Sequence, residues 1–141
     1  MSETAQHLPG STVFVSTEED GWSAMTILES RGFGANATIQ AAPLDNPGAA
    51  RQLSKEECVQ ILDADPMALR GSPDMVKFTK LSEAALLHNL RVRYARNEIY
   101  TRAGSILISV NPFKALQIYS AERMHEAKVS ATSVTPMPPV R

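Results

Sequence analysis

The hydrophobic pattern of this chain changes its period between residues 63 and 73, which restricts the chain to a fold with two different parts. Before this segment, short runs of β-forming residues alternate with turns. After it, leucines recur every three or four residues, which is typical of a helix. The segment itself contains two prolines, one glycine and two aspartates. We therefore predict that 63–73 is a linker between a β-rich part and a part that contains a helix.

The β-rich part, residues 11–62, is predicted to form a small β-barrel. Asp20–Gly21 predicts a hairpin turn between its first two strands, because glycine accepts the positive φ of such a turn. Several short strands separated by turns are typical of small barrels and sandwiches. Trp22 is predicted to fill or cover the core rather than to dock a peptide, since large aromatics dominate small cores. The expected strands are Thr12–Val15, Trp22–Leu28, Ala37–Ala41 and Cys58–Leu62.

The second part is predicted to be an α+β segment of one helix and one β-hairpin. Ser82 can cap a helix whose first turn carries Glu83, where a negative charge suits the helix dipole. Strands at 99–101 and 105–110 flank a turn at 102–104, and the bulky second strand is typical of one covered on both faces. So short a chain does not supply that cover. The expected apolar stripe of the helix is Leu86, Leu87, Leu90 and Tyr94.

Charge and cysteine content exclude several classes of protein. The 14 basic and 15 acidic residues give a net charge of −1, which argues against electrostatic binding of nucleic acid. The arginines at 91, 93 and 96 are accordingly predicted to form a solvated helix face. Cys58 is alone, so it cannot form an intramolecular disulfide, and its acidic neighbours would raise its thiol pKa, which favours a structural role. The three histidines are too scattered to predict a metal site.

The composition of the two ends of the chain and the length of its longest apolar run lead to further expectations. Residues 1–10 are polar and predict a flexible leader, without the apolar run of a signal peptide. Residues 127–141 are rich in Ser, Thr, Val and Pro and predict a disordered tail. The longest apolar run, Ile106–Val110, is far too short to span a bilayer. We therefore expect an intracellular protein without a membrane span.

The residues after the last predicted strand are the best candidates for a ligand site. Asn111–Pro112 ends the strand with an amide and a rigid ring, and Lys114 and Tyr119 follow shortly after. Such groups could hold a flat heterocycle. A strand-ending turn without a ligand would have much the same residues, so both interpretations stay open. None of the seven glycines precedes a lysine, which excludes a phosphate-binding P-loop within these residues.

These residues, taken in order, resemble the start of a myosin motor domain. The resemblance runs from residue 74 to 126, and we expect residues 127–141 to match nothing in that family. The preceding residues 13–62 more loosely resemble the Src-homology-3-type barrel at the front of many myosins. The segments that carry the motor resemblance are Asp74–Glu83, Leu86–Leu90, Arg93–Tyr94, Ile99–Thr101, Gly104, Leu107–Lys114 and Ile118–Tyr119.

The resemblance implies a role for four residues of the candidate site. In the family, the Asn-Pro turn and the following tyrosine border the adenine pocket of the ATP site. Carried over to this chain, Asn111, Pro112, Lys114 and Tyr119 would line the base side of that pocket. Ala115 stands where the family often has an arginine or a large aromatic, which would weaken the site. The hairpin strands would belong to the central sheet of the motor.

The resemblance also implies a function for the intact family, namely ATP-dependent movement on actin with Mg²⁺ as the metal of the nucleotide. The implied partners are the remainder of the motor domain, actin filaments and light chains, in the cytoplasm and on the cytoskeleton. The P-loop and both switch loops are missing from these 141 residues. This chain alone is therefore expected to be inactive and to bind no nucleotide tightly.

The alternative function is that of a short, non-catalytic interaction module. It would use the barrel around Trp22, or dock through Ile106–Val110. An unpaired run of branched apolar residues is an aggregation hazard that a self-sufficient protein usually blunts, which favours the motor segment. We also predict that the isolated chain is poorly soluble or partly unfolded after the linker.

Overall fold

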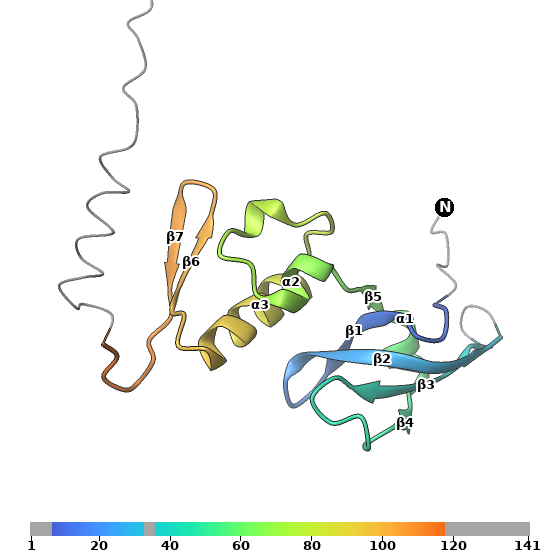
Figure 1. Cartoon of the computed structure of the whole chain (residues 1–141). Coiled ribbons are helices and arrows are strands. Elements are labelled where there is room, and N and C mark those ends of the chain that lie inside the picture. Colours follow the sequence, from blue (N-terminus) through green and yellow to red (C-terminus); the bar gives the residue numbers. More distant parts are fainter. Residues whose placement is uncertain (1–6, 33–35, 118–141) are drawn as a thin grey trace, which may run out of the picture. The chain divides into compact units, whose positions relative to one another are not determined.

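The computed structural model describes residues 7–32 and 36–117 (Figure 1). The described residues up to Val110 form one unit, and those from Asn111 onward belong to a second. Most of the predicted leader, the predicted tail at 127–141 and Tyr119 lie outside the described residues. The domain boundaries at 62 and 74 stay predictions.

The β-rich part is a five-stranded antiparallel sheet in the order β4-β3-β2-β1-β5. The predicted hairpin is confirmed, because Thr17 pairs with Gly21, whose φ is 73°. A register shift between Ile27 and Glu29 lets the long second strand bend while pairing with both neighbours. The strands are β1 (Thr12–Thr17), β2 (Gly21–Arg31), β3 (Thr38–Pro43), β4 (Arg51–Gln52) and β5 (Leu62–Asp63).

Inward-facing residues of these strands, together with Leu53 just after β4, form the barrel core. β1 shows the alternation directly, since Val13 and Val15 enter this core while Phe14 points to the opposite face. The predicted fold class, a small Src-homology-3-like β-barrel followed by an α+β segment, is confirmed. The buried core residues are Val13, Val15, Met25, Ile27, Ile39, Ala41 and Leu53.

The predicted strand at Cys58–Leu62 is wrong, because residues Lys55–Val59 form helix α1. Ser54 and Glu57 make a capping box, in which each side chain bonds to the other residue's backbone N–H. This pairing satisfies two donors that a helix start leaves without partners, and it outweighs the β-branched character of the segment. Strand β5 begins only at Leu62.

The segment predicted as a linker contains helix α2, Pro66–Arg70. Asp65 caps its start and Pro66 occupies its first turn. Gly71 ends it with φ 80°, the left-handed conformation that favours glycine. A short 3₁₀ turn, η2, follows at Met75–Lys77. These helix caps and the 3₁₀ turn lie within a few residues of one another, so this segment has a folded backbone rather than that of an extended linker.

Helix α3, Glu83–Ala95, begins at Ser82 as predicted, with the Ser82 hydroxyl accepting from Ala85 N at 3.1 Å. The predicted leucine stripe is only half-buried, and Tyr94 is 38% exposed. The most buried line of the helix runs instead through Ala85, Asn89 and Arg93, each four residues after the last. The expectation that Arg93 belongs to a solvated face is therefore wrong.

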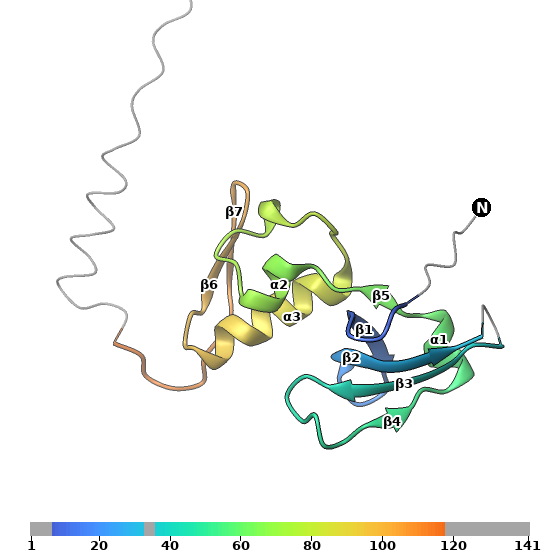
Figure 2. The ribbon, with the colours of Figure 1, turned by 45° about the vertical axis from the view of Figure 1, so that its right-hand side comes forward.

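A second apolar cluster joins the sheet to α2 and α3, which lie side by side in both views (Figures 1 and 2). Trp22 is half-buried against this cluster, which confirms that it covers the core. Arg91 adds a polar link, because its guanidinium donates to the carbonyls of Trp22 at 2.6 Å and of Asp20. The buried members are Phe14, Ala24, Ala68, Ala84 and Ala85.

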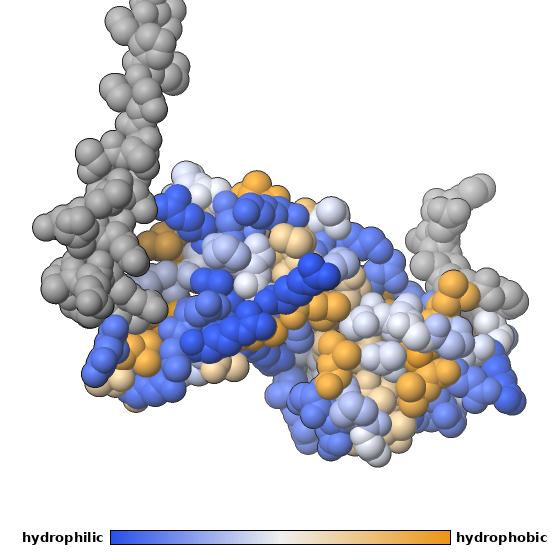
Figure 3. Space-filling view, viewed as in Figure 1, coloured by the Kyte–Doolittle hydropathy of each residue, from blue (hydrophilic) through white to orange (hydrophobic). Residues whose placement is uncertain are grey.

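The second sheet is the predicted hairpin of β6 (Tyr100–Ala103) and β7 (Ile106–Ser109). Ile106 and Leu107 are 64% and 60% exposed, so the strand predicted to need cover lacks it within the described residues. On the face shown in Figure 3, a hydrophilic strip lies over α3, and apolar patches are interrupted by polar surface. None of the described helices is long and apolar enough to cross a membrane.

Candidate functional site

The Asn111–Pro112 turn follows directly after the hairpin and is closed by its own side chain. The Asn111 Oδ1 atom accepts a hydrogen bond from Phe113 N at 2.9 Å. Phe113 has a positive φ of 52° and is 88% exposed. A side chain that bonds to the backbone two residues later is the usual way that asparagine stabilises a turn. The turn therefore has a defined local shape.

The four residues predicted for the adenine side are only partly brought together by the described structure. Asn111, Pro112 and Lys114 lie within one short stretch, with Asn111 and Lys114 exposed and Pro112 half-buried. Tyr119 lies outside the described residues. Ala115, next to Lys114, is exposed. A polar side chain, a rigid ring and a cation thus share this turn.

Arg93 forms hydrogen bonds to the base of the hairpin, from which this turn continues. The Val110 amide donates to the Ile99 carbonyl at 3.0 Å, which closes the open end of the hairpin. Arg93 donates from Nε to Thr101 Oγ1 at 2.9 Å and from Nη2 to the Tyr100 carbonyl at 2.8 Å. Sequence reasoning missed this role. The sequence signal that could have found it is the four-residue spacing of Ala85, Asn89 and Arg93, which places Arg93 on the buried line of the helix.

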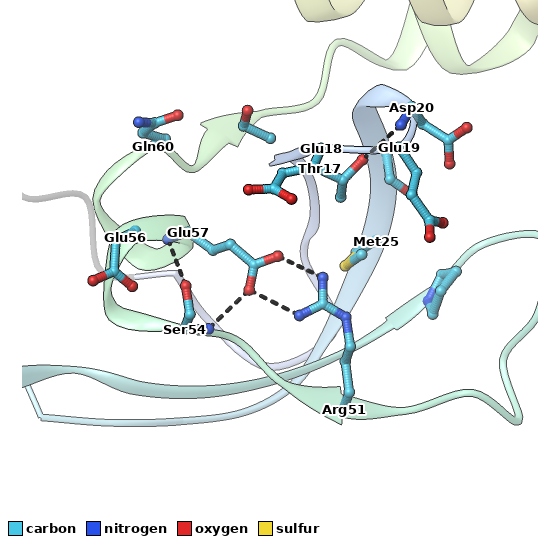
Figure 4. Close-up of a pocket in the computed structure, with 13 residues that line it drawn as sticks. Thr17, Glu18, Glu19, Asp20, Met25, Arg51, Ser54, Glu56, Glu57 and Gln60 are labelled. Carbon is cyan, nitrogen blue, oxygen red and sulfur yellow. Dashed lines mark hydrogen bonds and ion pairs between the residues drawn. The ribbon is translucent and has the colours of Figure 1, made fainter.

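The barrel has an open groove of about 920 Å³ between the β1–β2 turn and α1 (Figure 4). Arg51 donates to both carboxylate oxygens of Glu57, at 2.8 and 2.6 Å, and Glu57 also holds Ser54 N. The hydrogen bonds from Arg51 lower the pKa of the Glu57 carboxyl, and the same pair raises the Arg51 pKa. The acidic residues that line the groove are Glu18, Glu19, Asp20, Glu56 and Glu57.

This groove has the character of a solvated acidic surface rather than of a catalytic centre. Its one arginine is already paired with Glu57. Cys58 is half-buried nearby, and burial, followed by the charge of Glu57, raises the pKa of its thiol. A raised thiol pKa disfavours the nucleophilic thiolate, so Cys58 is structural. Among the described residues, no group of three His, Cys, Asp or Glu side chains could hold a metal ion.

Sequence comparisons identify the relatives of the chain. Residues 72–139 match the model of the myosin head (motor domain) family. Myosin-4 of Arabidopsis thaliana is 49% identical over 63 residues, covering 45% of this chain and 6% of that protein. Myosin-15 of the same plant is 37% identical over 118 residues, covering 83% and 7%. The Myosin-J heavy chain of Dictyostelium discoideum is 33% identical over 113 residues, covering 80% and 5%.

The chain belongs to the myosin family. The two longer matches cover so much of it that they include barrel residues as well as the motor segment. The match to the motor domain continues to residue 139, so the expectation that the resemblance ends at 126 is wrong. The chain spans less than a tenth of the length of these myosins, at 5 to 7%. All four candidate adenine-side residues fall within the matched part of the myosin motor domain.

Proposed function

We propose that this chain acts as the amino-terminal segment of an ATP-dependent, actin-based motor. The observation that carries the proposal is the match of residues 72–139 to the myosin motor domain. ATP with Mg²⁺, actin filaments and light chains are the ligands and partners that this role implies. The proposed location is the cytoplasm, in association with the cytoskeleton.

Within that motor, Asn111, Pro112, Lys114 and Tyr119 border the adenine base of the nucleotide. Support comes from the position of the Asn-Pro turn immediately after β7 and from its polar and cationic side chains. These residues hold only one end of the ligand. Phosphoryl transfer needs groups that fix the phosphates and Mg²⁺, and these come from the remainder of the motor.

The remainder of the motor is also the partner that the hairpin requires. Ile106 and Leu107 expose most of their apolar surface, and among the described strands β7 pairs only with β6. Burial of two such side chains contributes roughly 3 to 6 kcal/mol. We propose that further strands of the motor sheet cover this hairpin. The barrel is not proposed as an independent docking module, because Trp22 packs against the cluster that it shares with α2 and α3.

A hybrid head tests the proposal. In it, the full chain is joined in register to the part of the Arabidopsis Myosin-15 head that follows the aligned region. We expect the hybrid to release phosphate from ATP faster when actin filaments are added. Lys114→Ala and Asn111→Ala should raise the KM for ATP several-fold. Lys77→Ala is the matched control, because this exposed lysine lies on the 3₁₀ turn and outside the proposed site.

Two results would contradict the proposal. A hybrid that melts cooperatively and yet binds no ATP would remove the nucleotide role of this segment. A hybrid that turns over ATP with the same KM in all three variants would remove the assignment of the turn to the adenine side, while leaving the motor role in place.

A further inference from the structure

Arg93 lies in the last turn of α3 and has an unusual environment for a helical arginine. Its side chain is buried, with only 8% of the residue exposed. Nε donates to Thr101 Oγ1 at 2.9 Å, and Nη2 donates to the Tyr100 carbonyl at 2.8 Å. Nη1 donates to the Glu98 carboxylate at 3.2 Å and to the Gly71 carbonyl at 3.4 Å. One guanidinium therefore bonds to groups that precede its own helix and to groups that follow it.

These four acceptors join three separate elements at one point. Gly71 ends α2, Glu98 lies in the loop after α3, and Tyr100 and Thr101 begin β6. A guanidinium has five N–H donors in a fixed plane, which lets it bond in several directions at once. A lysine ammonium has the same charge but not this planar fork, so it could not reproduce the set.

The bonds from Arg93 fall at the end of the hairpin that leads to the Asn-Pro turn. Tyr100 pairs with Ser109, and Thr101 pairs with Ile108. The Val110 amide, the last before Asn111, is fixed to Ile99. Holding the first two residues of β6 therefore fixes the register of the last residues of β7.

A second buried polar contact, made by Asn89, lies on the same helix as Arg93 and reinforces this arrangement. Asn89, one turn before Arg93, is fully buried and donates from Nδ2 to the Ser72 carbonyl at 3.0 Å. The Arg102 amide donates to the Pro73 carbonyl at 2.8 Å, so the segment after α2 runs along β6. Gly71 has so little room that an added Cβ would lie 2.9 Å from Val92 Cγ1. The hairpin base is thus fixed to a close-packed support.

We propose that Arg93 is a positioning residue for the adenine-side turn, acting through Thr101 and the base of the β6–β7 hairpin. The inference rests on the proposed function, since it concerns the nucleotide that this turn would border. Arg93 does not itself touch the ligand. Its action is to fix the end of the hairpin, up to Val110, which Asn111 follows directly in the chain.

Hydrogen exchange on the full chain tests the first half of this proposal. Thr101→Val removes the hydroxyl that Arg93 bonds to and keeps the side-chain shape, whereas Thr101→Ser keeps the hydroxyl. We expect Thr101→Val and Arg93→Lys to reduce protection of the Val110 amide about tenfold, the change expected from the loss of one buried hydrogen bond. Thr101→Ser and Arg91→Lys should stay near the parent, because Arg91 lies on the same helix but bonds to the Trp22 and Asp20 carbonyls of the barrel. Equal protection in all four variants would overturn the proposal.

The second half is tested in the hybrid head by equilibrium binding of ADP and of pyrophosphate. The two ligands share phosphates, and only ADP carries the base. Arg93→Lys and Thr101→Val should weaken ADP binding about fivefold to tenfold and leave pyrophosphate binding unchanged. A variant that weakens both ligands equally, or neither, would refute a positioning role.

The two failures are distinguishable. If the parent hybrid binds pyrophosphate but gains nothing from the base of ADP, the adenine-side assignment fails, whatever Arg93 does. If the parent prefers ADP and the variants retain that preference, the assignment stands and the inference about Arg93 is wrong. If no hybrid binds either ligand, the motor role fails, and the exchange experiment still decides whether Arg93 fixes the hairpin.

Discussion

Asp65 is a buried carboxylate whose removal has a large and calculable effect. Oδ1 accepts from Met67 N at 2.8 Å and from Ala68 N at 3.4 Å. Oδ2 accepts from Thr79 N at 2.7 Å, and from Thr79 Oγ1 and Lys80 N at 2.8 Å each. One side chain therefore caps α2 and holds the loop that precedes α3.

The pKa of Asp65 gives the magnitude of this interaction. Burial by itself would raise the pKa, but hydrogen bonds from Lys80, Thr79 and Met67 outweigh it and lower the value from 3.8 to about 2. Each pH unit between the folded and unfolded pKa corresponds to about 1.4 kcal/mol. The ionised carboxylate therefore contributes roughly 2.5 kcal/mol to the free energy of unfolding at neutral pH.

Asp65→Asn keeps the size of the side chain and removes one of its two acceptors. The amide NH₂ must then face either the helix donors or the Thr79 and Lys80 donors, which leaves buried groups without partners. We expect the free energy of unfolding at pH 7 to fall by about 3 kcal/mol. Urea denaturation of the full chain, followed by the fluorescence of Trp22, measures this. Asp45→Asn, at an exposed loop position, is the control.

The pH dependence supplies an independent check with a definite sign. Because the folded pKa of Asp65 lies below the unfolded value, its stabilisation is complete above about pH 5 and is lost as the pH falls through about 2. The parent should therefore lose more stability over this interval than Asp65→Asn. If both proteins lose stability in parallel, or if Asp65→Asn stays within about 0.5 kcal/mol of the parent at pH 7, the reasoning is refuted.

Two further predictions concern the end of α2 and the exposed strand. Gly71→Ala should lower the free energy of unfolding by about 2 kcal/mol, because its φ is 80° and the new Cβ would lie 2.9 Å from Val92 Cγ1. Thermal melts measure this against Gly48→Ala, where the added atom has room; equal melting points would contradict it. Ile106→Lys should reduce self-association, because Ile106 is 64% exposed on β7. Light scattering after size exclusion, at rising concentration, would show no difference from the parent if this expectation is wrong.

The features that could be predicted from the sequence depend on neighbouring residues. The Asp20–Gly21 hairpin, the Ser82 cap and the β6–β7 hairpin each have their signal within a few positions, and all three are confirmed. Helix α1 has a local signal too, the Ser54–Glu57 capping box, but the apolar run at 58–62 favours a strand. A short helix and a short strand share such a run, and periodicity alone does not separate them.

The features that could not be predicted depend on residues far apart in the chain. Arg93 belongs to a run of helical arginines of the kind that is usually solvated. Only the fold brings it within hydrogen-bonding distance of Thr101. Asp65 lies in the segment whose composition predicts a linker, although its second oxygen bonds to residues fourteen and fifteen positions later. The Asn-Pro turn was predicted from its residues and from a family resemblance. Its position relative to a nucleotide stays a proposal.

The cluster between the sheet and the two helices also limits how this chain can change over evolutionary time. Four of its five buried members are alanines, at positions 24, 68, 84 and 85. A larger residue at any of these positions would force the sheet and the helices apart, and glycine is the only smaller residue. Phe14, which belongs to a barrel strand, completes the same cluster. The barrel therefore cannot be exchanged for another by recombination without matching replacements on α2 and α3, so the two parts should be inherited as one piece.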